Sequence, residues 1–384
     1  MFRNILKMRI LFLVYHGFSE YSGISKKIHY QVKGLQENGH DVRLCYYTFS
    51  ENGHRCRFVD GKLLKDYGSS IFAPVLQRVD YKCIYDYCVR EKIEFVYARS
   101  FQNATPWLIS LFKNFQKAGI RAVTEIPTYP YDSEFSPYIW QQPLRFIIDK
   151  LFRKKLCSHM DAIVTFSDAS CIFGQRTINI SNGVDLDSIP VHTPIEQRNN
   201  TLHMIAVAEV HQWHAFDRMI EGLGEYYLHT TDPYNLFFHV VGGIWPGHMT
   251  GKRGFKTLID KYGLQDRVIL HGQLFGKKLD DVFEMCQFAV GSLGRHRSGI
   301  SVIKTLKNRE YASRGLPFIY SENDPDFDQQ QYIMKAPADE SPIDVQKIVE
   351  FMDSFKMQPI DIRKTVVHLT WKNQMQKVLD SVFY

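Results

Sequence analysis

The stretch 304–321, KTLKNREYASRGLPFIYS, constrains the fold of this chain more than any other segment. An apolar run at 288–293 precedes it and suits a buried strand. A repeat of three and four residues over 302–313 then predicts a helix. The helix should end at Gly315, because glycine tolerates the left-handed conformation of a helix C-terminus and Pro317 cannot continue a helix. The apolar, β-favouring residues that follow predict a second strand.

The loop between the first strand and the helix reads GRHRSGIS, at 294–301. A strand, a helix and a strand in this order predict parallel strands with a right-handed connection, which places the loop at the C-terminal edge of a sheet, where ligands bind. A helix N-terminus there offers N–H groups and a positive dipole to an anion. We therefore expect phosphate to bind at Arg295 and Arg297, with Ser298 and Gly299 in the same site.

Lys304, Lys307 and Glu310 follow the loop at intervals of three residues, so they should lie along one stripe of the predicted helix. The lysines suit phosphate, and the carboxylate can accept hydrogen bonds from sugar hydroxyls. A solvated face of salt bridges explains the same spacing, and the pattern alone favours that interpretation.

The string LKNREYASRGLPFIYS resembles the C-terminal nucleotide-sugar signature of retaining GT-B glycosyltransferases of family 4 (glycosyl transferases group 1), in the branch with Lys-x-x-Glu-Tyr-x-x-x-Gly-x-Pro. The resemblance implies an α/β fold of two Rossmann-like parallel-sheet domains facing a central cleft. It implies that Glu310 holds the ribose hydroxyls of a nucleotide diphosphate sugar, and that Lys307 or Lys304 faces the diphosphate. Capsular and exopolysaccharide enzymes are the type that it suggests.

Weaker similarities to other motifs of the family occur in the same order along most of the chain. They divide it into an acceptor-side domain at 1–187, a polar linker at 188–200 and a nucleotide-sugar domain at 201–360. A C-terminal helix within 361–384 is expected to cross back to the first domain, as it does in the family.

The chain opens with a strand, a glycine-containing loop, a helix and a second strand, which is typical of Rossmann-like halves. Gly17 and Gly23 in that loop would let the backbone approach the diphosphate. A plain tight turn is the alternative, because the full GxGxxG pattern is absent.

A Pro- and Tyr-rich segment without periodicity follows the strand RAVTEIP. Long loops at strand ends often bind ligands, and in the family this position faces the acceptor. The candidates for acceptor contacts are Glu125, Tyr129, Tyr131, Asp132 and Glu134. Packing of the loop onto its own domain is the competing interpretation.

By the same resemblance, His271, Gln273 and Leu274 contact the nucleotide base, mainly through backbone groups. Family members place an Arg and a Lys on the diphosphate, and the matching positions of this chain hold Glu209 and His214. His214 could instead donate a hydrogen bond or a proton to phosphate, although a lone histidine is more often structural.

The first glutamate of the family motif is also missing, because its position holds Val302. Arg295, Arg297, Lys304, Lys307 and Arg218 are the remaining candidates to balance the charge of the leaving diphosphate. The resemblance implies transfer without a metal, because GT-B enzymes generally work without one, so we expect neither a metal nor another cofactor.

Composition limits the number of domains, the binding partners and the cellular compartment that we expect. With 384 residues, 45 % of them hydrophobic, the chain is long enough for two domains, and a net charge of +6 without a nucleic-acid motif does not indicate nucleic-acid binding. Seven irregularly spaced cysteines suit a reducing cytosol. The basic amphipathic segment 145–156 would allow peripheral binding to an anionic membrane on its inner face, or would pack on its own sheet.

Two functions follow. The first is a glycosyltransferase that moves a hexose from a UDP-, GDP- or ADP-sugar to a hydroxyl of a glycan or lipid-linked glycan, with retention at the anomeric carbon as the resemblance implies. The second is a catalytically degenerate GT-B protein that binds nucleotide sugar or serves as a partner subunit. The altered diphosphate positions motivate the second, and donor turnover distinguishes the two.

Overall fold

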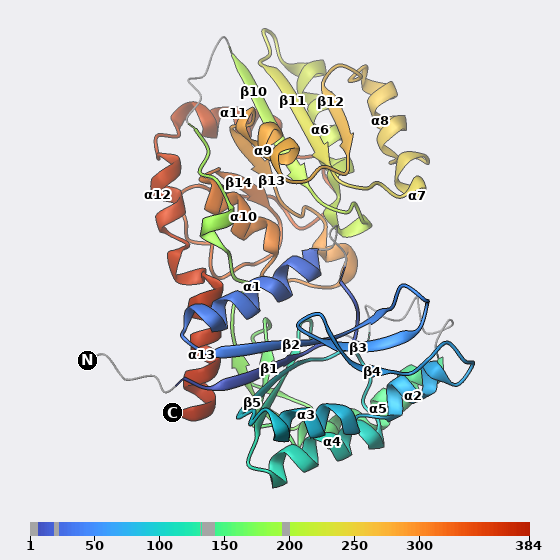
Figure 1. Cartoon of the computed structure of the whole chain (residues 1–384). Helices are drawn as coiled ribbons and strands as arrows, with labels where there is room; N and C mark the ends of the chain where they lie inside the picture. The colour runs from blue at the N-terminus through green and yellow to red at the C-terminus, as the bar shows by residue number, and fades with distance from the viewer. Residues whose placement is uncertain (1–6, 19–22, 131, 133–142, 194–199) are drawn as a thin grey trace. The chain divides into compact units, whose positions relative to one another are not determined.

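The computed structural model describes residues 7–18, 23–130, 132, 143–193 and 200–384 of the chain (Figure 1). Its contacts divide it into two compact units. Unit 1 comprises Met1–Gly183 together with Trp371–Tyr384, and unit 2 comprises Val184–Thr370. Within the described ranges, every helix is too short or too polar to span a bilayer.

Unit 1 is built on a nine-stranded sheet in the order β4-β3-β2-β1-β5-β6-β7-β9-β8. Its strands are β1 (Arg9–Leu13), β2 (Asp41–Phe49), β3 (Arg55–Val59), β4 (Lys62–Asp66), β5 (Phe95–Arg99), β6 (Arg121–Ile126), β7 (Ala162–Thr165), β8 (Cys171–Ile172) and β9 (Gln175–Asn179). The central strands are parallel, and β3, β4 and β8 pair antiparallel at the two edges.

Helices cover both faces of this sheet because its central strands are apolar on both sides. Ile10 and Phe12 of β1 belong to a core cluster with α1 and α13, whereas Leu11 and Leu13 belong to a second cluster with α3 and α4. The helices of unit 1 are α1 (Gly23–Glu37), α2 (Ala73–Val79), α3 (Lys82–Arg90), α4 (Pro106–Lys117), α5 (Pro143–Cys157) and α13 (Trp371–Phe383).

The last helix, α13, completes the core of unit 1 beside α1, as Figure 1 shows at the red and blue ends of the chain. Two glycines permit this contact. A Cβ on Gly34 of α1 would lie 2.7 Å from the backbone of Trp371, and one on Gly183 would lie 2.5 Å from its indole ring. Trp371 is 2 % exposed, so close packing against glycine buries the largest side chain of α13.

Unit 2 is built on a six-stranded parallel sheet in the order β12-β11-β10-β13-β14-β15. Its strands are β10 (Thr201–Val207), β11 (Asn235–Val241), β12 (Val268–Gly272), β13 (Phe288–Val290), β14 (Phe318–Tyr320) and β15 (Ile333–Lys335). Along the sequence, β10, β11 and β12 lie one after another toward one edge of the sheet, whereas β13, β14 and β15 lie one after another toward the other edge. The order therefore reverses between β10 and β13, which is where open α/β sheets bind ligands.

Two helical layers enclose this sheet. Met204 and Ala206 of β10 face the side of α6, α8 and α11, and Ile205 faces the side of α9, α10 and α12. The helices are α6 (Phe216–His229), α7 (Pro246–Met249), α8 (Phe255–Tyr262), α9 (Lys277–Glu284), α10 (Leu306–Arg314), α11 (Val345–Ser354) and α12 (Pro359–Lys364), with short 3-10 turns at Leu186–Ser188, Gln212–His214, Arg295–Ser298 and Val367–Leu369.

The predicted strand, helix and strand around 288–320 are present as β13, α10 and β14, and Gly315 caps α10 in the left-handed conformation with φ +83°. The predicted start of this helix was wrong. Val302 bridges to Asn323 in an extended segment, and the helix begins at Leu306, because the hydroxyl of Thr305 caps it by accepting from the Asn308 N–H.

The β3–β4 hairpin was missed. Its turn residues, Asp60 and Gly61, both have positive φ, of +47° and +78°. Such a turn is the one that an Asp-Gly pair between two strands favours, so the signal was present in the sequence. A C-terminal helix is present within the predicted range 361–384, where α13 begins at Trp371 after a short turn. Residues 194–199 of the predicted linker lie outside the described residues.

Candidate functional site

The candidate site lies in unit 2, at the C-terminal ends of β10, β13 and β14 and the N-terminus of α10. Backbone hydrogen bonds join the loops that follow these strands. The N–H of Leu293 donates to the carbonyl of His214 at 3.0 Å, and the N–H of Ser321 donates to that of Ser292 at 2.9 Å. The loops therefore form one connected surface around the switch point between β10 and β13.

Lys307 lies in the first turn of α10. Its Nζ is buried, has no hydrogen-bond partner among the described residues and lies 5.9 Å from the centre of the Phe216 ring. Burial and the nearby charge of Arg295 lower its pKa to about 7, partly opposed by Glu322. A buried ammonium without a partner is costly, so this lysine is set up to receive an anion.

Glu322 lies two residues after the end of β14 and is 3 % exposed. Neither of its carboxyl oxygens has a hydrogen-bond partner in the described part of the chain. Burial raises its pKa to about 7, and the backbone, Arg295 and Lys307 oppose that rise. The sequence analysis did not select this residue, although a charged side chain shortly after a buried strand at this edge was a usable signal.

His214 ends the loop between β10 and α6 and is also buried. Its Nδ1 accepts from the His211 N–H at 3.0 Å, so the hydrogen of the neutral ring sits on Nε2. Burial, with the charges of Lys307 and Arg295, lowers its pKa well below the usual value. His214 is therefore a neutral hydrogen-bond donor at pH 7.

Arg295 and Arg297, which were predicted to bind phosphate, differ in their surroundings. Arg297 is held by two carboxylates, with Nη2 2.9 Å from Asp217 and Nε 2.9 Å from Glu340. The guanidinium of Arg295 lies over the Trp213 ring at 5.6 Å and is close enough to Lys307 to lower its pKa. Arg295 is thus the arginine that the structure brings together with Lys307.

Two further predicted residues shape the turn that carries these arginines. The hydroxyl of Ser298 donates to the carbonyl of Arg295 at 2.8 Å, and Gly299 ends the turn in the left-handed conformation with φ +67°. Both residues therefore have a local role in the turn, and a contact of either with a ligand stays a prediction.

Lys304, Lys307 and Glu310 do not form the expected helical stripe, because Lys304 precedes the helix. Glu310 accepts from Arg314 one turn later, at 3.1 Å from Nε and 2.9 Å from Nη2. Arg314 also donates to Asp280 at 2.8 Å. Glu310 is thus part of an ion-pair network on α10, and its contact with ribose stays a prediction.

The residues predicted to contact the base follow β12. Gln273 approaches Gly243, where a Cβ would lie 3.3 Å from its Nε2, and Leu274 packs against the core. His271 takes part in a row of three imidazoles across neighbouring strands. His203 Nδ1 lies 2.9 Å from His239 Nε2, and His239 Nδ1 lies 2.9 Å from His271 Nε2.

Three residues of unit 1 were predicted to contact the diphosphate or the acceptor, namely Gly17, Gly23 and Glu125. A Cβ on Gly17 would lie 2.9 Å from the carbonyl of Tyr47, and Gly23 begins α1. Glu125 is fully buried. Its carboxylate accepts from Gln31 at 2.6 Å, Tyr97 at 2.7 Å and Arg99, and Lys27 lies 3.3 Å away.

This network explains the charge state of Glu125. Its buried cations and hydrogen bonds outweigh desolvation and lower its pKa to about 2.

The remaining acceptor candidates lie at the loop after β6. Tyr129 packs edge-on against Phe173 at 5.7 Å, and Asp132 accepts from Arg153 at 2.6 Å. Tyr131 and Glu134 lie outside the described residues.

A cavity of about 350 Å³ adjoins the loop that carries His214. The side chains that line it include His211, His248, Arg253, Arg297 and Glu340, all of unit 2. Its walls are polar and charged, and the ion pairs of Arg297 form one side of it. Such a lining suits a polar ligand rather than an apolar one.

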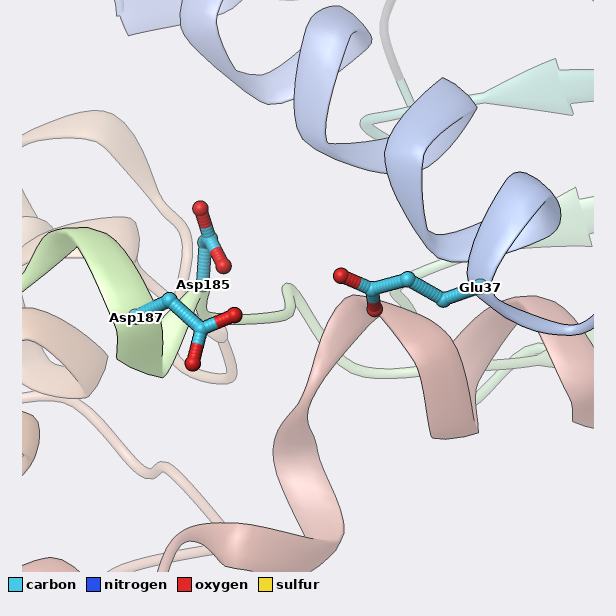
Figure 2. Close-up of side chains that lie close together, drawn as sticks. All are labelled: Glu37, Asp185 and Asp187. Atoms are coloured by element: carbon cyan, nitrogen blue, oxygen red, sulfur yellow. The ribbon is translucent and has the colours of Figure 1, made fainter.

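Figure 2 shows the carboxylates of Glu37, Asp185 and Asp187, which are ligand types that a metal ion can use. Glu37 is the last residue of α1 in unit 1, whereas Asp185 and Asp187 lie at the turn that opens unit 2. Because they come from different units, and because exposed acidic groups are common without an ion, no metal site is assigned to them.

No protein-family model matches the sequence, and no curated protein matches it. Solved structures match over nearly the whole chain. The catalytic domain of starch synthase IV from Arabidopsis thaliana, bound to ADP and acarbose, has a TM-score of 0.60 at 11 % identity, covering 98 % of this chain and 99 % of that one. Anabaena HepE in complex with UDP has a TM-score of 0.59 at 11 % identity, with coverages of 98 % and 99 %.

Sucrose-phosphate synthase from Thermosynechococcus elongatus has a TM-score of 0.55 at 13 % identity, covering 98 % of this chain and 95 % of that one. At such identities the likeness establishes the fold alone. The chain, with two units built on mainly parallel α/β sheets, has the GT-B fold of these glycosyltransferases.

Proposed function

We propose that this protein is a glycosyltransferase that moves a hexose from a nucleotide diphosphate sugar to a hydroxyl of a glycan or lipid-linked glycan, with retention. The observation that carries the proposal is the buried Lys307 ammonium, which has no partner among the described residues and lies at the N-terminus of α10 beside Arg295. A helix N-terminus with two cations is a site for an anion, and a diphosphate fits that description. The likeness to structures that contain UDP or ADP supports the same ligand class.

The chemistry requires positive charge at the leaving group. When the sugar leaves, negative charge develops on the nucleoside diphosphate, and preorganised cations and donors stabilise it. Lys307 and Arg295 supply the charge, and His214 supplies a neutral N–H donor through Nε2. These groups would support transfer without a metal, so metal-free transfer is part of the proposal.

The first test is thermal unfolding with UDP, GDP and ADP in turn. A ligand at about 100 times its dissociation constant adds roughly 2.7 kcal/mol of stability. One nucleotide should stabilise the wild type and should stabilise Lys307→Met much less. Lys347→Met, an exposed lysine on α11 of the same unit, is the matched control and should behave as the wild type. If no nucleotide stabilises a folded wild-type protein, the proposal is wrong.

We also propose that the acceptor is reached at an anionic membrane surface, on the cytoplasmic side, in polysaccharide synthesis. Leu144, Ile147 and Leu151 recur at three and four residues on α5 and are 73 %, 53 % and 69 % exposed. Lys154 and Lys155 lie in its last turn. An exposed apolar stripe with basic residues beside it is the pattern of a helix that rests on anionic lipid.

The neighbouring helix α2 extends this surface. Ile71 and Phe72, which precede α2, and Val75 within it are 86 %, 66 % and 56 % exposed. Burial and then the charge of Arg78 on α2 lower the pKa of Arg145 on α5. Sedimentation with vesicles of anionic and of neutral lipid tests the proposal. The wild type should bind the anionic vesicles, Leu144→Ser/Leu151→Ser should not, and Leu228→Ser, an equally exposed leucine on α6 of unit 2, should bind like the wild type.

The second candidate function, nucleotide-sugar binding without transfer, is favoured by Glu209 and His214 at positions where the resembling family has Arg and Lys. Release of free nucleotide from the donor distinguishes it from transfer. A protein that binds the nucleotide but releases none in the presence of acceptor glycans would be a binding module.

A further inference from the structure

Glu322 stands out among the buried carboxylates because its side chain has no partner. It follows β14 at the C-terminal edge of the unit 2 sheet and is 3 % exposed, and both its carboxyl oxygens lack a hydrogen bond within the described part of the chain. A buried carboxyl usually accepts several hydrogen bonds, as Glu125 does in unit 1. An unsatisfied one costs stability and persists where a ligand completes it.

The same edge holds further buried polar atoms without hydrogen-bond partners among the described residues. They include the ammonium of Lys307 and the hydroxyl of Ser292, which follows β13. Ser292 and the residue before Glu322 are joined by the hydrogen bond from the Ser321 N–H to the Ser292 carbonyl, at 2.9 Å. Three unsatisfied groups, a donor cation, an acceptor and a hydroxyl, therefore meet where β13, β14 and α10 converge.

The backbone around Glu322 holds it in place. The N–H of Asn323 donates to the carbonyl of Ser301 at 2.7 Å, and the N–H of Ile303 donates to the carbonyl of Asn323 at 3.0 Å. Lys335 donates to the backbone carbonyl of Glu322. The side chain thus stays at this edge because its own strand end is paired on both sides.

The combination of charges selects the ligand. Lys307 and Arg295 suit phosphate, but a carboxylate beside them repels a second anion and accepts hydrogen bonds from hydroxyl groups. A ligand that satisfies all of them carries phosphate and hydroxyls on neighbouring parts. A sugar linked to a diphosphate meets this requirement better than a diphosphate alone.

We propose that Glu322 contacts the sugar of the donor, accepting hydrogen bonds from its hydroxyls, while Lys307 contacts the adjoining diphosphate. This inference rests on the proposed function and names a residue that selects the sugar. Glu322 then distinguishes the intact donor from the spent nucleotide, which lacks the sugar hydroxyls.

Calorimetric titration tests the proposal, with the nucleoside diphosphate that stabilises the wild type and with its glucose, galactose and mannose derivatives. In Glu322→Gln, which keeps the size of the side chain, the affinity for the best nucleotide sugar should fall at least about tenfold, the usual effect of losing a hydrogen bond to a charged group. The affinity for the free nucleotide should stay the same or rise, because the substitution removes a carboxylate that repels the diphosphate. Glu350→Gln, on α11, is the matched control and should change neither.

Each outcome either supports the inference or overturns it. Equal losses for the nucleotide and the nucleotide sugar in Glu322→Gln would place Glu322 at the ribose or in the fold, and would overturn the inference. Unchanged affinity for both would also overturn it. In a third outcome, the wild type binds the free nucleotide and yet binds each of the three nucleotide sugars no more tightly than Glu322→Gln does. That result would refute the inference and leave nucleotide binding intact. A wild type that binds neither would refute the proposed function, and this inference with it.

Discussion

Arg309 on α10 and Asp324 after β14 form a two-pronged ion pair that has no exposed surface. Nη2 of Arg309 lies 2.9 Å from Oδ1 of Asp324, Nη1 donates to Oδ2, and Asp326 accepts from the same guanidinium. The pair ties the helix that carries Lys307 to the loop that carries Glu322. It therefore sets the relative positions of the two charged groups at the candidate site.

Removing Arg309 should be strongly destabilising. Arg309→Met leaves Asp324 buried without its cation, and breaking a buried pair costs roughly 3–5 kcal/mol. Urea unfolding of the purified protein measures this loss. Arg43→Met is the control, because Arg43 is 46 % exposed and pairs with Asp41 and Asp60 at the surface, where a pair contributes about 1 kcal/mol or less. Equal losses in the two variants would contradict the role assigned to Arg309.

Gly34 of α1 should not tolerate alanine. The added Cβ would lie 2.7 Å from the Trp371 backbone, so α13 must shift, and overpacking of this kind costs about 1–3 kcal/mol. Gly23→Ala, at the start of the same helix, has nothing within 4 Å and should be neutral or slightly stabilising. Thermal unfolding of the two variants makes the comparison, and a neutral Gly34→Ala would show that α13 does not pack as described.

The imidazole row of His203, His239 and His271 should make unit 2 sensitive to acid. Burial and the two neighbouring histidines lower the pKa of His239 to about 4, below its unfolded value of about 6.5. The unfolded chain therefore binds the proton more readily. The stability from this group is complete above about pH 6.5 and is lost as the pH falls toward 4, by at most about 3 kcal/mol.

Urea unfolding from about pH 4 to about pH 7.5, which spans the folded and the unfolded pKa of His239, measures the effect. His239→Asn should lose less stability than the wild type across this window, because asparagine does not titrate. His229→Asn, an exposed histidine at the end of α6, is the control. Parallel pH profiles for His239→Asn and the wild type would contradict the prediction.

Nucleotide binding should weaken as the pH rises above 7. The pKa of Lys307 is about 7 in the unliganded site, and a bound diphosphate favours the charged ammonium and so raises it. Between the two pKa values the affinity should fall by up to about tenfold per pH unit. Dissociation constants measured on either side of neutrality test this, and Lys307→Met should bind weakly with a smaller dependence on pH, because Glu322 still titrates at the site.

Much of the fold could be predicted from local patterns. The parallel strands around β13 and β14 follow from short apolar runs that flank a helix, and the end of α10 follows from Gly315 and Pro317. The start of α10 could not be read from periodicity, because the hydroxyl of Thr305 caps the helix and ends the repeat at that point. Cap chemistry, rather than apolar spacing, decides where this helix begins.

The candidate site was only partly predictable. Lys307, Arg295 and His214 were selected from the loop and the motif, and the structure brings them together. Glu322 was missed because its burial depends on the packing of three separate segments. The histidine row was missed because its members stand 36 and 32 residues apart, and only the register of β10, β11 and β12 aligns them.

The place of α13 has a consequence for the order in which the protein is made. Trp371 and the helix that it begins belong to the core of unit 1, yet the ribosome makes all of unit 2 before it makes them. Domains that fold during synthesis generally fold as their chain emerges. Unit 2 can therefore complete its core first. Until α13 has been synthesised, unit 1 keeps an uncovered apolar face on α1.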